Sequence, residues 1–161
     1  MEIKLTDLGM LQRKQTLYMF FALIVMGLMF FFPLLRFIDP NSNTYELTYL
    51  GIVNIDTGDY IVKAIPLTIL LVVIVLLLLI TIFSYKKRVL QMRLSVFSIL
   101  LMLGSLGLIY FYSLHGKGKT GGEIFYLYPV IFPVISVILA FLAFKGVKKD
   151  EELVRSYDRI R

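Results

Sequence analysis

The chain has 161 residues, of which 58% are hydrophobic and only 17% are charged, and it carries a formal net charge of +6. A soluble domain of ordinary composition has about 25% charged residues, so an ordinary soluble fold is excluded. The chain has no cysteine, which excludes disulfides, thiol catalysis and cysteine metal sites.

Four stretches of 19 to 21 residues contain no Asp, Glu, Lys or Arg: 17–35, 64–83, 94–113 and 124–144. A helix needs about 20 apolar residues to cross a membrane, so each stretch predicts a transmembrane helix. The first stretch is too long for a signal-peptide core and has no cleavage site after it. The chain is therefore predicted to be one four-span membrane domain over residues 1–161, with outer loops 36–63 and 114–123 and a cytoplasmic tail 145–161.

Basic residues predict the orientation of these spans. Four spans place both ends of the chain on one side, which then holds 13 Lys and Arg residues, against four on the other side, Arg36, Lys63, Lys117 and Lys119. Because basic residues concentrate in cytoplasmic segments, both termini and the middle loop are predicted to be cytoplasmic. The positive net charge follows from this topology, and we expect no nucleic-acid partner.

The first outer loop carries a strand pattern. Tyr45, Leu47 and Tyr49 alternate with polar residues, which is typical of a strand, and the turn sequence Asp56-Thr57-Gly58-Asp59 precedes Tyr60–Val62. We expect a small β-hairpin over the outer ends of the helices. The acidic residues of this loop do not follow the spacing of a calcium-binding loop.

The second outer loop, His115–Gly122, reads HGKGKTGG and ends like a nucleotide-binding phosphate loop. Such a loop needs a leading glycine at position 113, which is Ser113, and a preceding short strand, whereas a predicted span precedes this one. We interpret it as a flexible polar connection and expect no nucleotide. His115 is the only histidine, so it is interpreted as a solvated loop residue.

The spans contain no ionisable residue of the kind that marks ion-coupled transport. Their Ser and Thr hydroxyls are expected to bond to their own backbone or to a neighbouring helix. Pro133 cannot donate a backbone hydrogen bond to Pro129, and this predicts a kink in the fourth span. The kink favours either a broken helix lining a site or, more commonly, a tolerated irregularity.

The tail predicts a separate cytoplasmic helix. Lys145–Lys149, with Gly146, is interpreted as a hinge, and Asp150 suits an N-cap. The following residues 151–160 place apolar side chains on one face, so we expect an amphipathic helix packed on the membrane or on protein. The predicted fold class is thus an all-α four-transmembrane-helix bundle with a small outer hairpin and a short amphipathic C-terminal helix.

The two ends carry a resemblance. The segments MLQRKQTLY, Met10–Tyr18, and DEELVRSYDRIR, Asp150–Arg161, resemble the opening M-[LI]-Q-R-x-Q-[ST]-[LV]-Y and the tail D-E-x-L-V-R-S-x-D-R-[LI]-R of the family named domain of unknown function 4293. The resemblance covers about 150 residues by hydropathy and implies a small four-span inner-membrane protein of the Bacteroidota. It implies no activity. Residues 1–9 precede the family-like start, and either Met1 or Met10 is the initiator.

These observations predict a non-enzymatic inner-membrane accessory or scaffold protein that acts through its cytoplasmic termini. The alternative is a transporter or channel for a small or lipid-like solute. A membrane enzyme ranks third because no nucleophile, base or metal cluster is found, and no cofactor is expected. Besides the lipid bilayer, the expected partner is an unidentified membrane or cytoplasmic protein. The candidate partner-binding residues are polar residues of the two family-like segments: Gln12, Arg13, Gln15, Arg155, Ser156, Asp158, Arg159 and Arg161.

Overall fold

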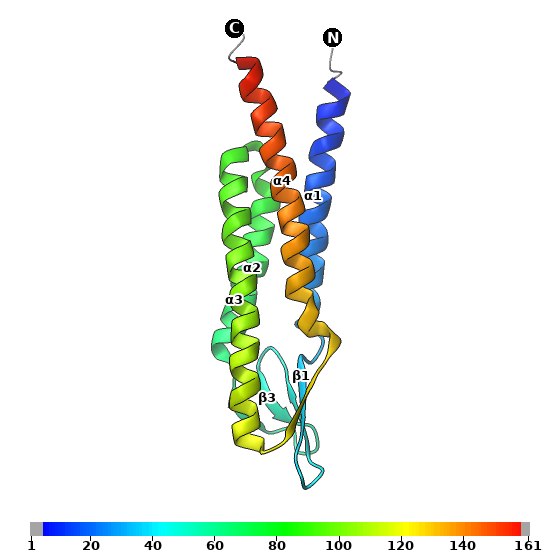
Figure 1. Cartoon of the computed structure of the whole chain (residues 1–161), viewed down its shortest axis with the longest axis vertical. Helices are drawn as coiled ribbons and strands as arrows, with labels where there is room; N and C mark the ends of the chain where they lie inside the picture. The colour runs from blue at the N-terminus through cyan, green and yellow to red at the C-terminus, as the bar shows by residue number, and fades with distance from the viewer. Residues whose placement is uncertain (1–4, 159–161) are drawn as a thin grey trace.

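The computed structural model describes the backbone of residues 5–158 and the side chains of residues 15–85 and 87–152. Four long helices run side by side, with a β-sheet at one end and the ends of α1 and α4 at the other (Figure 1). The helices are α1 Leu5–Leu28, α2 Ile65–Phe83, α3 Arg88–Thr120 and α4 Phe132–Asp158. Short 3-10 turns η1, Ser84–Lys86, and η2, Tyr128–Ile131, precede α3 and α4.

The sheet shows that the predicted all-α fold class is wrong. Five antiparallel strands form it in the order β4-β3-β2-β1-β5. Two of them, β2 and β4, lie where the alternating loop pattern predicted strands. They pair with β3 rather than with each other, so the expected two-stranded hairpin is also wrong. The strands are β1 Leu35–Ile38, β2 Thr44–Leu47, β3 Gly51–Asn54, β4 Tyr60–Lys63 and β5 Glu123–Tyr126.

Two of the strands come from segments that were assigned to spans or their edges. Strand β1 begins at Leu35, the last residue of the first predicted span, because α1 already ends at Leu28. Strand β5 takes up the start of the fourth predicted span, and α4 begins only at Phe132. The side chains of Leu35 and Phe37 are buried while Arg36 and Ile38 are exposed, so β1 has the two-residue alternation of a half-buried strand.

Three helical segments of the described chain are long and apolar enough to cross a membrane: Ile65–Phe83, Arg88–Thr120 and Tyr128–Glu152. The apolar part of α1 is shorter, Gln15–Leu28. Segment Ile65–Phe83 has a mean hydropathy of 3.3, and only 28% of it is buried inside the protein. Apolar helices with such exposed surfaces indicate a membrane protein.

Each helix contributes a stripe of buried side chains to a common core. The stripe of α3 is rich in serine, and small side chains of this kind let neighbouring helices approach closely. Ser95 and Ser98 donate to Gln91 and Leu94 carbonyls at 2.8 and 2.9 Å, as predicted for such hydroxyls. The buried apolar side chains of the helices include Met19, Ala22, Met26, Leu67, Leu71, Ile74, Leu78, Met102, Ile109, Ala140, Ala143 and Val147.

The segment HGKGKTGG is mostly helical, so its interpretation as a flexible connection is wrong. Helix α3 continues to Thr120 and ends at Gly121, whose φ of 66° is the left-handed conformation that glycine adopts easily at a helix end. Gly116 faces the sheet. A Cβ atom there would lie 2.5 Å from Phe37 Cζ. The missing side chain therefore lets the last turns of α3 pack directly on β1.

Helix α4 differs from its prediction at both ends. Pro133 lies in its first turn, where no backbone N–H is needed, and the 3-10 turn η2 directly precedes α4, so the irregularity lies at the start of this helix rather than inside it. At the other end, α4 continues through Gly146 to Asp158 in one piece. The predicted hinge at Lys145–Lys149 and the separate tail helix are therefore wrong. The side chains of the expected apolar face, residues 153–160, lie outside the described side chains.

Candidate functional site

A buried polar contact joins the two terminal helices at the end of the protein opposite the sheet. Gln15 of α1 donates from Nε2 to Asp150 Oδ2 of α4 at 2.7 Å. The two residues are 135 positions apart in the sequence. Gln15 is 6% exposed and Asp150 is 1% exposed. The bond therefore links the two ends of the chain within the interior of the helical part.

The close approach of α1 and α4 at this contact depends on a glycine. Gly146 lies one helical turn before Asp150 on the same face of α4. A Cβ atom at Gly146 would lie 2.7 Å from Gln15 Cγ. Any other residue at this position would push the Gln15 side chain away. Gly146 thus provides the space in which Gln15 reaches Asp150.

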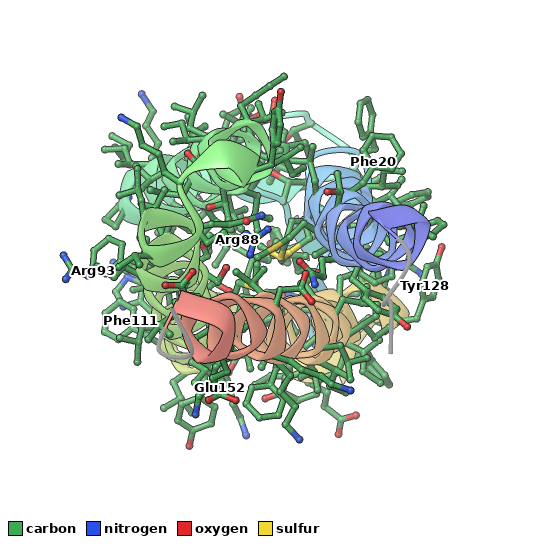
Figure 2. All side chains as sticks on the ribbon, turned by 90° about the horizontal axis from the view of Figure 1, so that it is seen from above. Phe20, Arg88, Arg93, Phe111, Tyr128 and Glu152 are labelled. Carbon is green, nitrogen blue, oxygen red and sulfur yellow. The ribbon has the colours of Figure 1, made fainter. Side chains whose placement is uncertain are left out.

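The third helix adds a positive charge to the same place. Arg88, the first residue of α3, donates from Nη1 to the backbone carbonyl oxygen of Asp150 at 3.4 Å. Figure 2, which looks along the helices from the end opposite the sheet, shows Arg88 pointing between the helices, whereas Arg93 points outward. Gln91, one turn further along α3, is 4% exposed. Three helices therefore place polar side chains around one point.

These side chains surround a cavity of about 10 Å³. That volume is close to the minimum that holds one water molecule. Asp150 Oδ1 is buried there and has no hydrogen-bond partner among the described residues. A buried polar atom of this kind needs a partner such as an ordered water. The residues that line the cavity, here named the polar cluster, are Gln15, Thr16, Tyr85, Arg88, Gln91 and Asp150.

The polar cluster is a set of hydrogen-bonding groups at which α1, α3 and α4 meet. Burying a carboxyl group is costly unless hydrogen bonds compensate it. Gln15 donates one such bond to the Asp150 side chain, while Arg88 donates to the Asp150 backbone carbonyl oxygen. Within the described residues, no group of three or more His, Cys, Asp or Glu side chains could hold a metal ion. The arrangement can fix how α1, α3 and α4 meet, because each contributes a group that the others need.

The candidate partner-binding residues fall into two groups. Gln15 is inside the polar cluster, so its side chain faces Asp150 rather than the surface. The other residues lie at or beyond the ends of α1 and α4, and their side chains lie outside the described residues: Gln12, Arg13, Arg155, Ser156, Asp158, Arg159 and Arg161.

Sequence reasoning missed Asp150 as a core residue. It interpreted Asp150 as an N-cap, because glycine and three lysines just before it resembled a hinge. The spacing of the apolar and small residues along α4 is the signal that places Asp150 on the buried face. The buried residues of α4 recur every three or four positions up to Asp150, which is the period of one helix face. They are Pro133, Ser136, Ala140, Ala143, Val147 and Asp150.

The comparison with protein-family models agrees with the resemblance carried by the two ends. The model of the family described as "Domain of unknown function (DUF4293)" matches residues 11–160. The match includes both helices of the Gln15–Asp150 contact. The comparison with curated proteins found no match.

Proposed function

Since the chain belongs to this family, whose description assigns no activity, we propose from the geometry that it is a non-enzymatic docking or scaffold protein of the inner membrane. In this proposal, the paired ends of α1 and α4 bind a protein partner on the cytoplasmic side. The helical part lies in the membrane, and the sheet lies on the outer side.

The observation that carries the proposal is the hydrogen bond between Gln15 and Asp150. Gln15 belongs to the first family-like segment, Met10–Tyr18, and Asp150 begins the second, Asp150–Arg161. The bond holds together the two segments that carry the family resemblance. A partner that contacts one of them therefore meets the other at the same place.

The shape of the molecule supports the same role. Helices α1 and α4 extend beyond the turn between α2 and α3, and so protrude from the rest of the protein (Figure 1). In sequence, the protruding segments combine Gln12 and Arg13 with Arg155, Ser156 and Asp158. Arginine is favoured at protein interfaces because its planar group pairs with carboxylates in a fixed geometry. A partner surface with acidic residues fits this composition.

The distribution of basic residues supports the orientation. Of the 13 Lys and Arg residues predicted to be cytoplasmic, ten lie in the described segments at the end of the protein that carries the polar cluster: the first half of α1, the turn between α2 and α3, the first turns of α3 and the second half of α4. The sheet end carries four, Arg36, Lys63, Lys117 and Lys119. The positive-inside rule assigns the first end to the cytoplasm.

The test is affinity purification of the full-length protein from native membranes, with the tag on a loop of the sheet. We expect a partner in fixed proportion with the parent protein, and loss of that partner when Arg155 and Arg159 are both replaced by Gln. The matched control replaces Lys117 and Lys119 by Gln, which removes two charges from the opposite end. If both double variants retain the same proteins, the proposal fails.

The transporter alternative has lost the observation that supported it. It depended on a kink inside the fourth span, but Pro133 lies in the first turn of α4 and Pro129 in the 3-10 turn before it. The only enclosed polar space described above has room for about one water molecule.

A further inference from the structure

A groove lies where the sheet meets the start of α2. Its volume is about 270 Å³, and apolar atoms make up nearly all of its wall. One side is formed by Leu50, in the turn between β2 and β3, and by Tyr60 of β4, and the other by the first turns of α2. The lining residues are Leu50, Tyr60, Lys63, Ile65, Thr68 and Ile69.

The α2 side of the groove presents no free hydroxyl group, because the hydroxyl of Thr68 is already bonded. Thr68 Oγ1 donates to the Tyr49 carbonyl oxygen at 2.5 Å and also lies 3.2 Å from the Ala64 carbonyl oxygen. The neighbouring Ile65 and Ile69 are 58% and 59% exposed. Exposed isoleucines beside a satisfied hydroxyl make a surface that an acyl chain can cover without displacing a hydrogen bond.

The groove opens onto a longer apolar stripe of α2. Ile69, Val73, Leu76 and Ile80 are all exposed and recur every three or four residues, so they share one face of the helix. This helix is long and apolar enough to cross a membrane. The groove differs from the rest of the stripe because Leu50 and Tyr60 enclose it from a second side. An acyl chain in the groove would touch protein on two sides instead of one.

The end of the groove nearest the sheet is positively charged. Lys63 is exposed and directly precedes the N-cap of α2, and no described acidic side chain forms an ion pair with it. The first turn of α2 contains no acidic residue. A lysine at the membrane surface attracts anionic lipid headgroups. The tyrosine beside it, Tyr60, is a residue type enriched at that depth.

We propose that this groove binds one anionic phospholipid, with an acyl chain along Ile65 and Ile69 and the phosphate against Lys63. The proposal depends on the membrane placement proposed above and not on partner docking at the other end. The apolar wall and the charge are both required. The wall alone would accept any lipid, whereas Lys63 selects a negative headgroup.

The test is native mass spectrometry of the detergent-purified protein mixed with phosphatidylglycerol or with phosphatidylcholine of the same acyl chains. We expect one retained phosphatidylglycerol and a preference of about fivefold over phosphatidylcholine, the effect of one basic residue near a membrane surface. Lys63→Gln is expected to abolish the preference. Lys119→Gln, a control at the same end of the protein but outside the groove, is expected to keep it.

A second pair of variants tests the apolar wall. Ile69→Trp fills the groove and is expected to reduce retention of both lipids. Leu76→Trp places the same side chain on the same exposed stripe outside the groove, and is expected to retain phosphatidylglycerol. Equal retention of the two lipids by the parent protein would overturn the proposal. It would also be overturned if Lys63→Gln and Lys119→Gln reduced the lipid preference equally, or if Ile69→Trp and Leu76→Trp reduced lipid retention equally. Loss of partner binding at the far end would leave these results unchanged, so the two proposals fail separately.

Discussion

Gly146 and Gln15 lie so close together that a methyl group added at Gly146 would be 2.7 Å from Gln15 Cγ. The contact lies between the two ends of the chain, and it leaves room for the hydrogen bond between Gln15 and Asp150. The glycine is therefore a packing residue of the α1–α4 interface, and this role can be tested directly.

Gly146→Ala is expected to lower the stability of the detergent-solubilised protein by about 1–3 kcal/mol, because overpacking must move Gln15 or separate the two helices. The measurement is equilibrium unfolding, followed by circular dichroism. The control is Gly107→Ala in α3, where an added Cβ would meet no atom within 4 Å. That change is expected to be neutral or stabilising by up to about 1 kcal/mol, because alanine favours the helix. Equal losses in the two variants would refute the packing role.

The hydrogen bond itself is tested with a double-mutant cycle. Gln15→Leu leaves the Asp150 carboxylate buried with fewer partners, and is expected to cost about 1–3 kcal/mol. Asp150→Leu similarly leaves Gln15 without its acceptor. The double variant replaces both polar partners by apolar ones. Its loss of unfolding free energy is expected to be smaller than the sum of the losses in the two single variants. A coupling energy of about 0.5 kcal/mol or more supports the contact. Simple additivity would show that the two side chains do not depend on each other.

The contact between α3 and the sheet gives a third prediction. Gly116→Ala is expected to destabilise the protein by about 1–3 kcal/mol, because its Cβ would lie 2.5 Å from Phe37 Cζ. Adding Phe37→Leu, which shortens the opposing side chain, is expected to recover part of the loss. Gly118→Ala is the control, since a Cβ there meets nothing within 4 Å. If Phe37→Leu lowers the stability of the Gly116→Ala variant by as much as it lowers the stability of the parent protein, the two residues are not in contact.

The proposed orientation predicts which ends a reporter can reach. A reporter enzyme that is active only outside the cytoplasm is inserted at Gly58, in the turn before β4, or fused after Arg161. We expect activity at Gly58 and none at Arg161, because the positive-inside rule assigns the termini to the cytoplasm. A fluorescent protein that matures only in the cytoplasm should give the reverse pattern. Reporter activity after Arg161 would refute the orientation.

Local patterns predicted part of the fold. The uncharged run 64–83 coincides with α2, because one apolar segment between two turns leaves little choice of boundary. The two-residue alternation around Tyr45 and the Tyr60–Val62 segment correctly indicated strands β2 and β4. The hydroxyls of Ser95 and Ser98 donate to carbonyl oxygens of their own helix, as expected. Each of these features depends on residues close together in the sequence.

The remaining features depend on residues far apart. Strand β5 follows from pairing with β1, and Ile124 alone cannot be distinguished from the start of an apolar span. Gly146 was interpreted as a hinge, because a glycine among lysines has the same local appearance whether it bends a helix or allows close packing. Asp150 was interpreted as a cap because its partner, Gln15, lies 135 residues earlier. The structural roles of β5, Gly146 and Asp150 are thus set by contacts with residues far away in the sequence.

Pairing of β1 with β5 has a mechanical consequence for the two terminal helices. Strand β1 follows α1 and β5 precedes α4, so the same two helices are joined by strand pairing at one end and by Gln15–Asp150 at the other. Sliding α4 along α1 by one turn, about 5.4 Å, would break both connections at once. We therefore expect α1 and α4 to keep a fixed register on each other, with α3 held to them through Arg88. Because the chain has no cysteine, pairs of introduced spin labels can measure this directly. Distances between α1 and α4 should stay fixed when a partner binds, and distances from this pair to α2 should carry any change.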